Sequence, residues 1–207
     1  MLLERLFKEK IMILDGAMGT ALQERNLTSV DFGGEEYDGC NEYLVITRPD
    51  VIQEIHEEYL AAGADIVETN TFGGTNFVLG EYDLQDKVDE VNTKAVQLAK
   101  AACKKYSTKD KPRFVAGAMG PTTKALSVTG GISFDDLAFS FYEQAKALTA
   151  AGSDYLLLET ALDTLNLKAA YVGILRAFDE LNKEIPIAIS GTIETMGTML
   201  AGQAVEA

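Results

Sequence analysis

Residues 61–69 read AAGADIVET, and residues 150–160 read AAGSDYLLLET. In each stretch, two alanines lead into a glycine, then into an apolar run, and then into a glutamate and a threonine. Glycine readily takes the left-handed conformation that ends a helix, and an unbroken apolar run is typical of a strand buried on both faces. Each stretch therefore predicts the end of a helix, a buried strand and an acidic residue at the strand's carboxyl end.

Similar apolar runs alternate with amphipathic segments along the rest of the chain. The runs lie at residues 11–14, 66–67, 114–116, 155–158 and 187–189. Apolar residues at helical spacing predict helices over residues 51–62, 88–102, 137–148 and 167–181, with Pro49 and Ser133 near two of the starts. Strands that alternate with helices and are buried on both faces favour a parallel sheet.

A second repeat helps to decide the fold class. Gly-Ala-Met-Gly follows the first apolar run at residues 16–19 and the third at residues 117–120. Repeated strand-helix units predict an α/β chain of the (β/α)8 TIM-barrel type, although a five-stranded flavodoxin-like sheet is the alternative. Such a barrel needs about 250 residues, so the 207 residues hold only about the first five β/α units. We expect residues 1–207 to form the N-terminal part of one barrel domain, with a further helix beginning near residue 196.

The composition excludes several classes of partner. The chain has 18 Lys and Arg residues against 32 Asp and Glu residues, a formal net charge of −14. This charge repels nucleic acid and anionic lipid, so we expect no nucleic-acid partner and no membrane association. Cys40 and Cys103 are too few for a disulfide framework or a four-cysteine zinc site. The two cysteines, interpreted as reduced thiols, predict a cytoplasmic protein. His56, beside two glutamates, reads as a solvated helix residue.

Polar residues that follow the strands are the candidates for a site, because a parallel barrel carries its active site at the carboxyl ends of its strands. In Asp15-Gly16-Ala17-Met18, the glycine allows a tight turn whose N–H groups can bind an anion. Asp15 and Glu159 together can hold a cationic amine, although a salt bridge to Lys or Arg explains Glu159 equally well. Asn70 and Thr71 either donate to a ligand or satisfy their own loop.

The same segments resemble the homocysteine S-methyltransferase family, in particular its cobalamin-dependent members with an N-terminal homocysteine-binding module. The resemblance runs from about residue 10 to the end of the chain. Its motifs occur in the family's order at Asp15–Thr20, Tyr37–Leu44, Glu68–Phe72, Gly117–Pro121 and Leu158–Thr160.

The resemblance implies a (β/α)8 barrel in which homocysteine is methylated to methionine. It places the amino group of homocysteine on Asp15 and Glu159 and its carboxylate on the N–H groups of the Gly16–Met18 turn. It also implies zinc and methylcobalamin as cofactors of the full-length enzyme, which gains the methyl group from 5-methyltetrahydrofolate through folate- and cobalamin-binding modules. The methyl donor itself is not encoded in these residues, because members of the family differ in it.

The family's zinc ligands are three cysteines on later strands, and neither Cys40 nor Cys103 matches one of them. We therefore expect no catalytic or metal-ligating residue in this chain. Zinc converts a bound thiol into a reactive thiolate. The chain alone should accordingly bind homocysteine weakly or not at all and transfer no methyl group. Unpaired strand edges should also favour self-association.

Two other functions fit the residues. One is a lyase or aldolase-like barrel in which a metal polarises a carbonyl or a lysine forms a Schiff base. Lys124 is the lysine placed just beyond a strand-end loop. The other is a non-catalytic binding piece.

Overall fold

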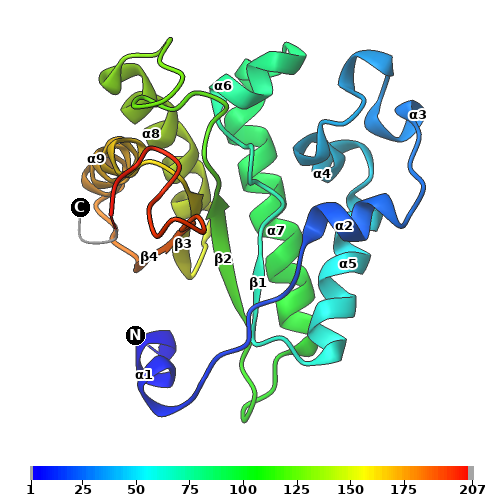
Figure 1. Cartoon of the computed structure of the whole chain (residues 1–207). Helices are drawn as coiled ribbons and strands as arrows, with labels where there is room; N and C mark the ends of the chain where they lie inside the picture. The colour runs from blue at the N-terminus through cyan, green and yellow to red at the C-terminus, as the bar shows by residue number, and fades with distance from the viewer. Residues whose placement is uncertain (1, 205–207) are drawn as a thin grey trace.

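Four parallel strands form one sheet in the computed structural model, which describes residues 2–204 (Figure 1). They are β1 (Ile66–Glu68), β2 (Phe114–Met119), β3 (Tyr155–Ala161) and β4 (Ile187–Gly191). Their order across the sheet is their order along the chain, and every neighbouring pair is parallel. This order is that of successive β/α units in a barrel.

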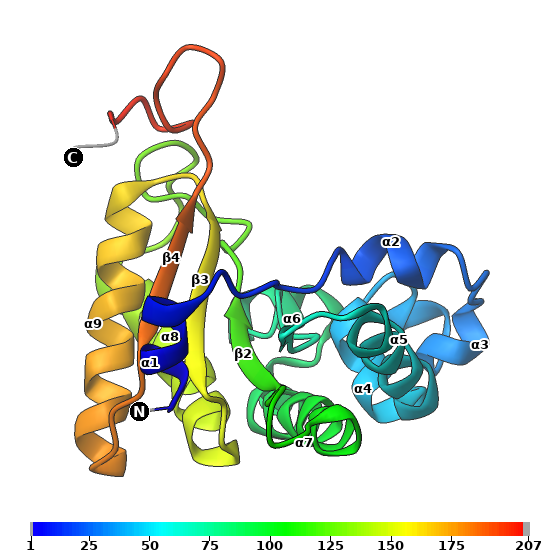
Figure 2. The ribbon, with the colours of Figure 1, turned by 90° about the horizontal axis from the view of Figure 1, so that it is seen from below.

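The four predicted long helices are present and pack on one face of the sheet (Figure 2). They are α5 (Pro49–Ala62), α7 (Val88–Tyr106), α8 (Phe134–Ala151) and α9 (Thr164–Leu181). Ser133 accepts the N–H of Asp136 at the start of α8, and glycines in the left-handed conformation end α5 and α8. A flavodoxin-like sheet carries helices on both faces, so the one-sided arrangement favours the barrel type.

Shorter elements fill the connections. These are α1 (Leu2–Glu9), α2 (Met18–Gln23), α3 (Ser29–Phe32), α4 (Leu44–Thr47) and α6 (Asn76–Leu79), with 3-10 helices η1 (Glu35–Tyr37), η2 (Asn41–Tyr43), η3 (Gly80–Tyr82) and η4 (Gln85–Lys87). Within residues 2–204, no helix is both long and apolar enough to span a bilayer.

Alternation along the strands divides the core into two sides. Leu156 and Leu158 pack with α8 and α9, whereas Tyr155 and Leu157 join a separate cluster with Leu3 of α1. The ring of Tyr155 also meets Phe7 of α1 edge-on, with centroids 6.4 Å apart. Because side chains alternate along a strand, a residue two positions after Leu157 lies on this same inner face.

The predicted strand over residues 11–14 is reduced to a single bridge, which is a difference from the sequence-based expectation. Leu14 pairs with Ile66 in a parallel bridge. The N–H of Ile66 donates to Ile13 O at 3.1 Å, and the N–H of Asp15 donates to Ile66 O at 3.0 Å. Ile11 is 87% exposed, because the segment has a neighbour on one side only. The sheet therefore has four strands and one bridged segment instead of five strands.

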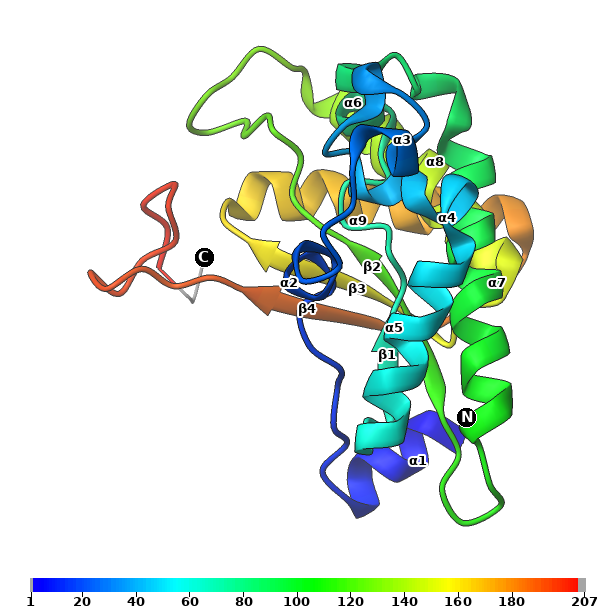
Figure 3. The same cartoon turned by 90° about the vertical axis from the view of Figure 1, so that its right-hand side faces the viewer.

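The helix expected from residue 196 onward is also absent over residues 196–204, and residues 205–207 lie outside the described part. Turns replace it, with the N–H of Gly197 donating to Glu194 O and that of Met199 to Gln203 O. Gly197 and Gly202 both have φ near +80°, a conformation that interrupts a helix. Figure 3 shows this segment extending beyond the carboxyl end of β4.

The contact between α8 and α9 generates a first prediction. A Cβ atom on Gly173 would lie 2.4 Å from Ala138 O and 2.7 Å from Tyr142 N, both of them backbone atoms. Gly173→Ala should therefore push the helices apart and lower the free energy of unfolding by about 1–3 kcal/mol, measured by urea titration. Gly19→Ala, where a Cβ meets nothing within 4 Å, is the matched control. Equal stability of Gly173→Ala and the wild type would contradict this packing argument.

The edges of the sheet generate a second prediction. β4 pairs with β3 alone, and Ile189 on it is 57% exposed. Unprotected apolar edges pair with other chains, so we expect concentration-dependent self-association in sedimentation velocity. Ile189→Lys should reduce it, because a charge on an edge strand opposes pairing. A wild-type chain that remains monomeric at all concentrations would refute the prediction.

Candidate functional site

A cavity of about 300 Å³ lies at the carboxyl ends of β1 and β3. Its lining comes from four separate parts of the chain. The lining residues are Asp15, Gly16, Ala17, Met18, Gly19, Asn41, Glu42, Glu68, Thr69, Asn70, Phe72 and Glu159. Six of the seven residues predicted from sequence therefore share one cavity, and Asp15 and Glu159 reach it from opposite sides of β2.

Hydrogen bonds to β1 hold Asp15 at the cavity. The main-chain N–H of Glu68 donates to both carboxylate oxygens of Asp15, at 3.1 Å each. The N–H of Asp15 itself donates to Ile66 O at 3.0 Å. The first loop is thereby fixed to the strand beside it, and the orientation of the Asp15 carboxylate is set by main-chain atoms.

The turn after Asp15 requires glycine for a steric reason. A Cβ atom on Gly16 would lie 2.9 Å from both Cε1 and the hydroxyl oxygen of Tyr59 on α5. The Tyr59 hydroxyl in turn donates to Ala17 O at 3.4 Å. The backbone at Gly16 and Ala17 therefore packs against the Tyr59 ring. The turn from Gly16 to Met18 forms part of the cavity wall.

The two polar residues predicted after β1 have different positions. Asn70 is 5% exposed, lines the cavity and donates through Nδ2 to Asn41 O at 2.7 Å. Thr71 is absent from the lining of this cavity, and its contacts favour the second of the two roles that the sequence left open. Its buried hydroxyl donates to Ala118 O at 2.7 Å and lies 2.6 Å from Thr69 Oγ1. Thr71 therefore satisfies the backbone between β1 and β2.

Sequence reasoning missed two further acids of the cavity. Glu42, on η2, accepts the N–H of Gly73 at 2.8 Å and so joins the connection after α2 to the loop after β1. Glu68 ends β1 two residues after the inward-facing Ile66. The repeat that singled out Glu159 contains Glu68 at the equivalent place, so that signal was present, whereas nothing in the periodicity marks Glu42.

The electrostatics of the cavity are those of acids without a cation. Burial, together with the nearby Glu68 and Glu159 carboxylates, raises the pKa of Asp15 to about 8. Burial and Glu68 raise the pKa of Glu159 to about 7. Burial also raises the pKa values of Glu68 and Glu42. No lysine or arginine lines the cavity among the described residues, so a bound cationic group would be attracted by unneutralised carboxylates.

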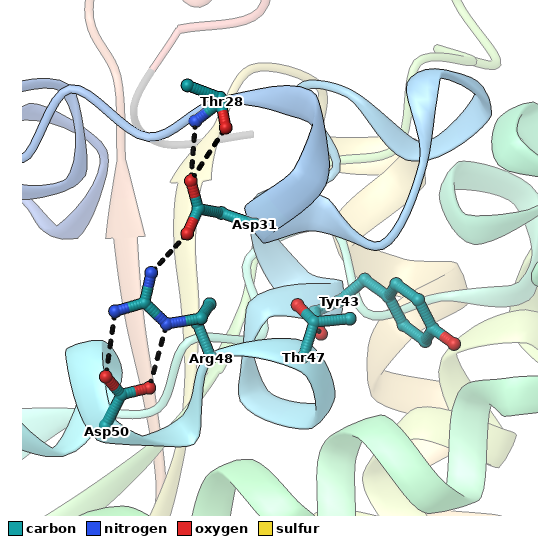
Figure 4. A network of polar contacts seen from close by, with 6 residues as sticks. All are labelled: Thr28, Asp31, Tyr43, Thr47, Arg48 and Asp50. Carbon is teal, nitrogen blue, oxygen red and sulfur yellow. Dashed lines mark hydrogen bonds and ion pairs between the residues drawn. The ribbon is translucent and has the colours of Figure 1, made fainter.

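A network around Arg48 holds the segment that brings Asn41 and Glu42 to the cavity (Figure 4). The Arg48 guanidinium bonds both oxygens of Asp50 at 3.0 and 2.8 Å and also bonds Asp31. Asp31 accepts the N–H and hydroxyl of Thr28 at the start of α3, at 2.8 and 3.0 Å. These bonds lower the pKa values of both aspartates. Arg48 thus joins α3 to the start of α5.

Other residues considered from sequence lie elsewhere. Lys124 lines a separate depression with Glu81 and Gln85 and does not reach the acidic cavity, so it gives no support to a Schiff-base site there. The expectation of a solvated His56 was wrong, because it continues the buried stripe of Ile52 and Leu60 on α5. The side chain is fully buried, neither ring nitrogen has a partner, and burial lowers its pKa to about 4.

The described residues do not fit the zinc ion that the family resemblance implies. Across residues 2–204, no three side chains of His, Cys, Asp or Glu are placed to hold a metal ion. Cys40 and Cys103 are buried and unbonded to each other. Burial raises their pKa values to about 11 and about 12, so both stay protonated thiols, whereas zinc binds thiolate.

Comparisons with known proteins find relatives in sequence and in fold. The family model described as homocysteine S-methyltransferase matches residues 12–207. Over 199 residues, the chain is 43% identical to methionine synthase of Mycobacterium leprae and 42% identical to that of Mycobacterium tuberculosis. These matches cover 96% of this chain but 16% of either relative. The oxidized form of the homocysteine methyltransferase MmuM from Escherichia coli has a similar fold, with a TM-score of 0.79 at 23% identity, covering 98% of this chain and 70% of that one.

The raised pKa of Glu159 generates a prediction on stability. A carboxyl group whose pKa is higher in the folded state than its unfolded value near 4.3 binds more protons when folded. Its stabilising effect is thus complete below pH 4 and is lost as the pH rises to about 7. Glu159→Gln should flatten the fall in unfolding free energy between pH 5 and 8, measured by urea titration.

The exposed Glu184 provides the control for this prediction. Glu184→Gln should leave the pH dependence as it is in the wild type. An unchanged pH dependence in Glu159→Gln would show that Glu159 ionises normally in the folded chain.

Proposed function

The chain belongs to the homocysteine S-methyltransferase family, and on that premise we propose that it is the homocysteine-binding part of a methyltransferase that makes methionine. One observation carries the proposal: Asp15 and Glu159, which come from separate β/α units, line one cavity together with the Gly16–Met18 turn. Residues 1–207 would then be the N-terminal part of a cytoplasmic homocysteine-binding barrel.

The cavity offers a complementary group for each charged end of an amino acid. The Asp15 and Glu159 carboxylates would accept hydrogen bonds from the ammonium group, and such bonds between ions are stronger than neutral ones. The N–H groups of Gly16, Ala17 and Met18 would donate to the carboxylate. Asn70, which lines the same cavity, would bound the remaining side of the ligand.

We do not assign activation of the homocysteine sulfur to this chain. The described residues do not supply a zinc site, and the chain spans 16% of the curated relatives that it matches. In the whole protein, zinc would supply sulfur activation, and methylcobalamin, with folate- and cobalamin-binding modules, would supply the methyl group. We therefore assign binding and orientation of homocysteine to this chain and expect no methyl transfer by it alone.

The test is a titration with reduced L-homocysteine, followed by NMR chemical shifts because the affinity should be low. Asp15→Asn should weaken binding about 10- to 100-fold, since a hydrogen bond to a charged group is worth about 1.5–3 kcal/mol. The ligand 4-sulfanylbutanoate, which lacks the amino group, should bind equally poorly to Asp15→Asn and the wild type.

The matched control is Asp110→Asn, an exposed aspartate far along the chain from the cavity segments. It should bind homocysteine like the wild type. The sequence alone allowed weak binding or none, whereas the cavity formed by these residues predicts weak but measurable binding. Wild-type binding that is equally strong with and without the amino group would refute the assignment of Asp15. No detectable binding of homocysteine would refute the proposed function.

A further inference from the structure

Glu68 adds a third carboxylate to the wall on which Asp15 and Glu159 lie. We propose that Glu68 couples amine binding to proton release: the incoming ammonium group displaces a proton held in this cluster of three carboxyl groups. This inference rests on the proposed function of the cavity, and it assigns to Glu68 a role that neither the sequence motifs nor the comparisons give it.

The geometry brings the three acids together in a defined way. Glu68 is the last residue of β1, and its main-chain N–H holds the Asp15 carboxylate. β2 lies between β1 and β3, and Glu68 pairs in register with its Ala116. Ala116 and Ala118 are small and fully buried, so β2 places no large side chain between the acids at this level.

The surroundings supply no compensating positive charge. Among residues 2–204, the ion pairs of lysines and arginines involve other acids and leave out Asp15, Glu68 and Glu159. A fourth acid, Glu42 on η2, lines the same cavity. The charges of the three acids also act on Tyr59 of α5, Cys103 of α7 and Tyr155 of β3. Glutamate, tyrosine and cysteine side chains are neutral when protonated and negatively charged when deprotonated. None of these four groups therefore stabilises the ionised forms of Asp15, Glu68 and Glu159 by a positive charge.

The pKa values agree with a shared proton at neutral pH. The pKa of Asp15 is about 8 and that of Glu159 about 7, and the Glu68 carboxylate is the largest charged contributor to both increases. With one proton, the three groups carry two negative charges. When an ammonium group binds and that proton passes to solvent, three negative charges and one positive charge again sum to two negative charges. Binding thus replaces the proton by the ammonium group and leaves the total charge of the cavity unchanged.

This exchange has a measurable consequence. Affinity for homocysteine should rise with pH between 6 and 8, by up to about tenfold per pH unit for one released proton. Below this pH range the carboxyl groups retain their proton, and that proton competes with the ammonium group for them. Without the Glu68 charge, the pKa values of Asp15 and Glu159 should fall toward those that burial alone sets. The affinity should then depend less on pH across the same range.

The first experiment needs no ligand. The carboxyl carbons of Asp15 and Glu159 are titrated by ¹³C NMR in the wild type, in Glu68→Gln and in Glu54→Gln. Glu68→Gln is nearly isosteric and keeps the main-chain N–H that holds Asp15. It should lower both pKa values, whereas Glu54→Gln, an exposed change on α5, should leave them raised. Equal pKa values of Asp15 and Glu159 in Glu68→Gln and in the wild type would overturn the inference.

The second experiment follows homocysteine binding by NMR at pH 6, 7 and 8. The slope of log affinity against pH should be clearly positive in the wild type and in Glu54→Gln, and smaller in Glu68→Gln. Equal slopes in wild type and Glu68→Gln would overturn the inference while leaving the proposed function intact. No binding at any pH, in contrast, would overturn the proposed function and would be recognised by the unresponsive wild type.

Discussion

The main-chain N–H of Glu68 that bonds both oxygens of Asp15 is the contact on which the cavity depends. The segment before Asp15 pairs with β1 through one bridge only, so a ladder of strand hydrogen bonds does not set its position. This bond, together with that from Asp15 N–H to Ile66 O, fixes where the first loop leaves the sheet. The glycine turn on Tyr59 follows from that position, and with it one wall of the cavity.

Much of the arrangement follows from local patterns in the sequence. The four long helices and the four strands were predictable because apolar spacing reports which face of each element is buried. Glu159 was predictable because parallel strands gather their carboxyl ends at one edge, and the repeat around Glu68 carries the same information. Six predicted residues of the cavity come from this rule and from the glycine turn.

The remaining features depend on contacts between distant segments, which periodicity does not report. Glu42 reaches the cavity because it accepts the N–H of Gly73. Arg48 holds the segment that contains Glu42 by bonding Asp31 and Asp50, which lie before and after Glu42 in the chain. For the same reason, His56 was misjudged, and the sequence left the role of Thr71 open between a ligand and the backbone. The partner of Thr71 is on β2, and His56 is covered by tertiary packing despite its acidic neighbours in sequence. The segment before Asp15 forms only one bridge because it has a neighbour on one side only. Over residues 196–204, the left-handed conformations of Gly197 and Gly202 interrupt the expected helix.

The depth at which the two cysteines lie has a chemical consequence for a protein that is proposed to bind a thiol. Cys40 and Cys103 are 1% and 4% exposed, and both remain protonated at neutral pH. Thiol–disulfide exchange proceeds through an accessible thiolate. Homocysteine that has oxidised to its disulfide would therefore find no reactive partner on this chain, and the protein is protected against forming mixed disulfides with its own proposed ligand.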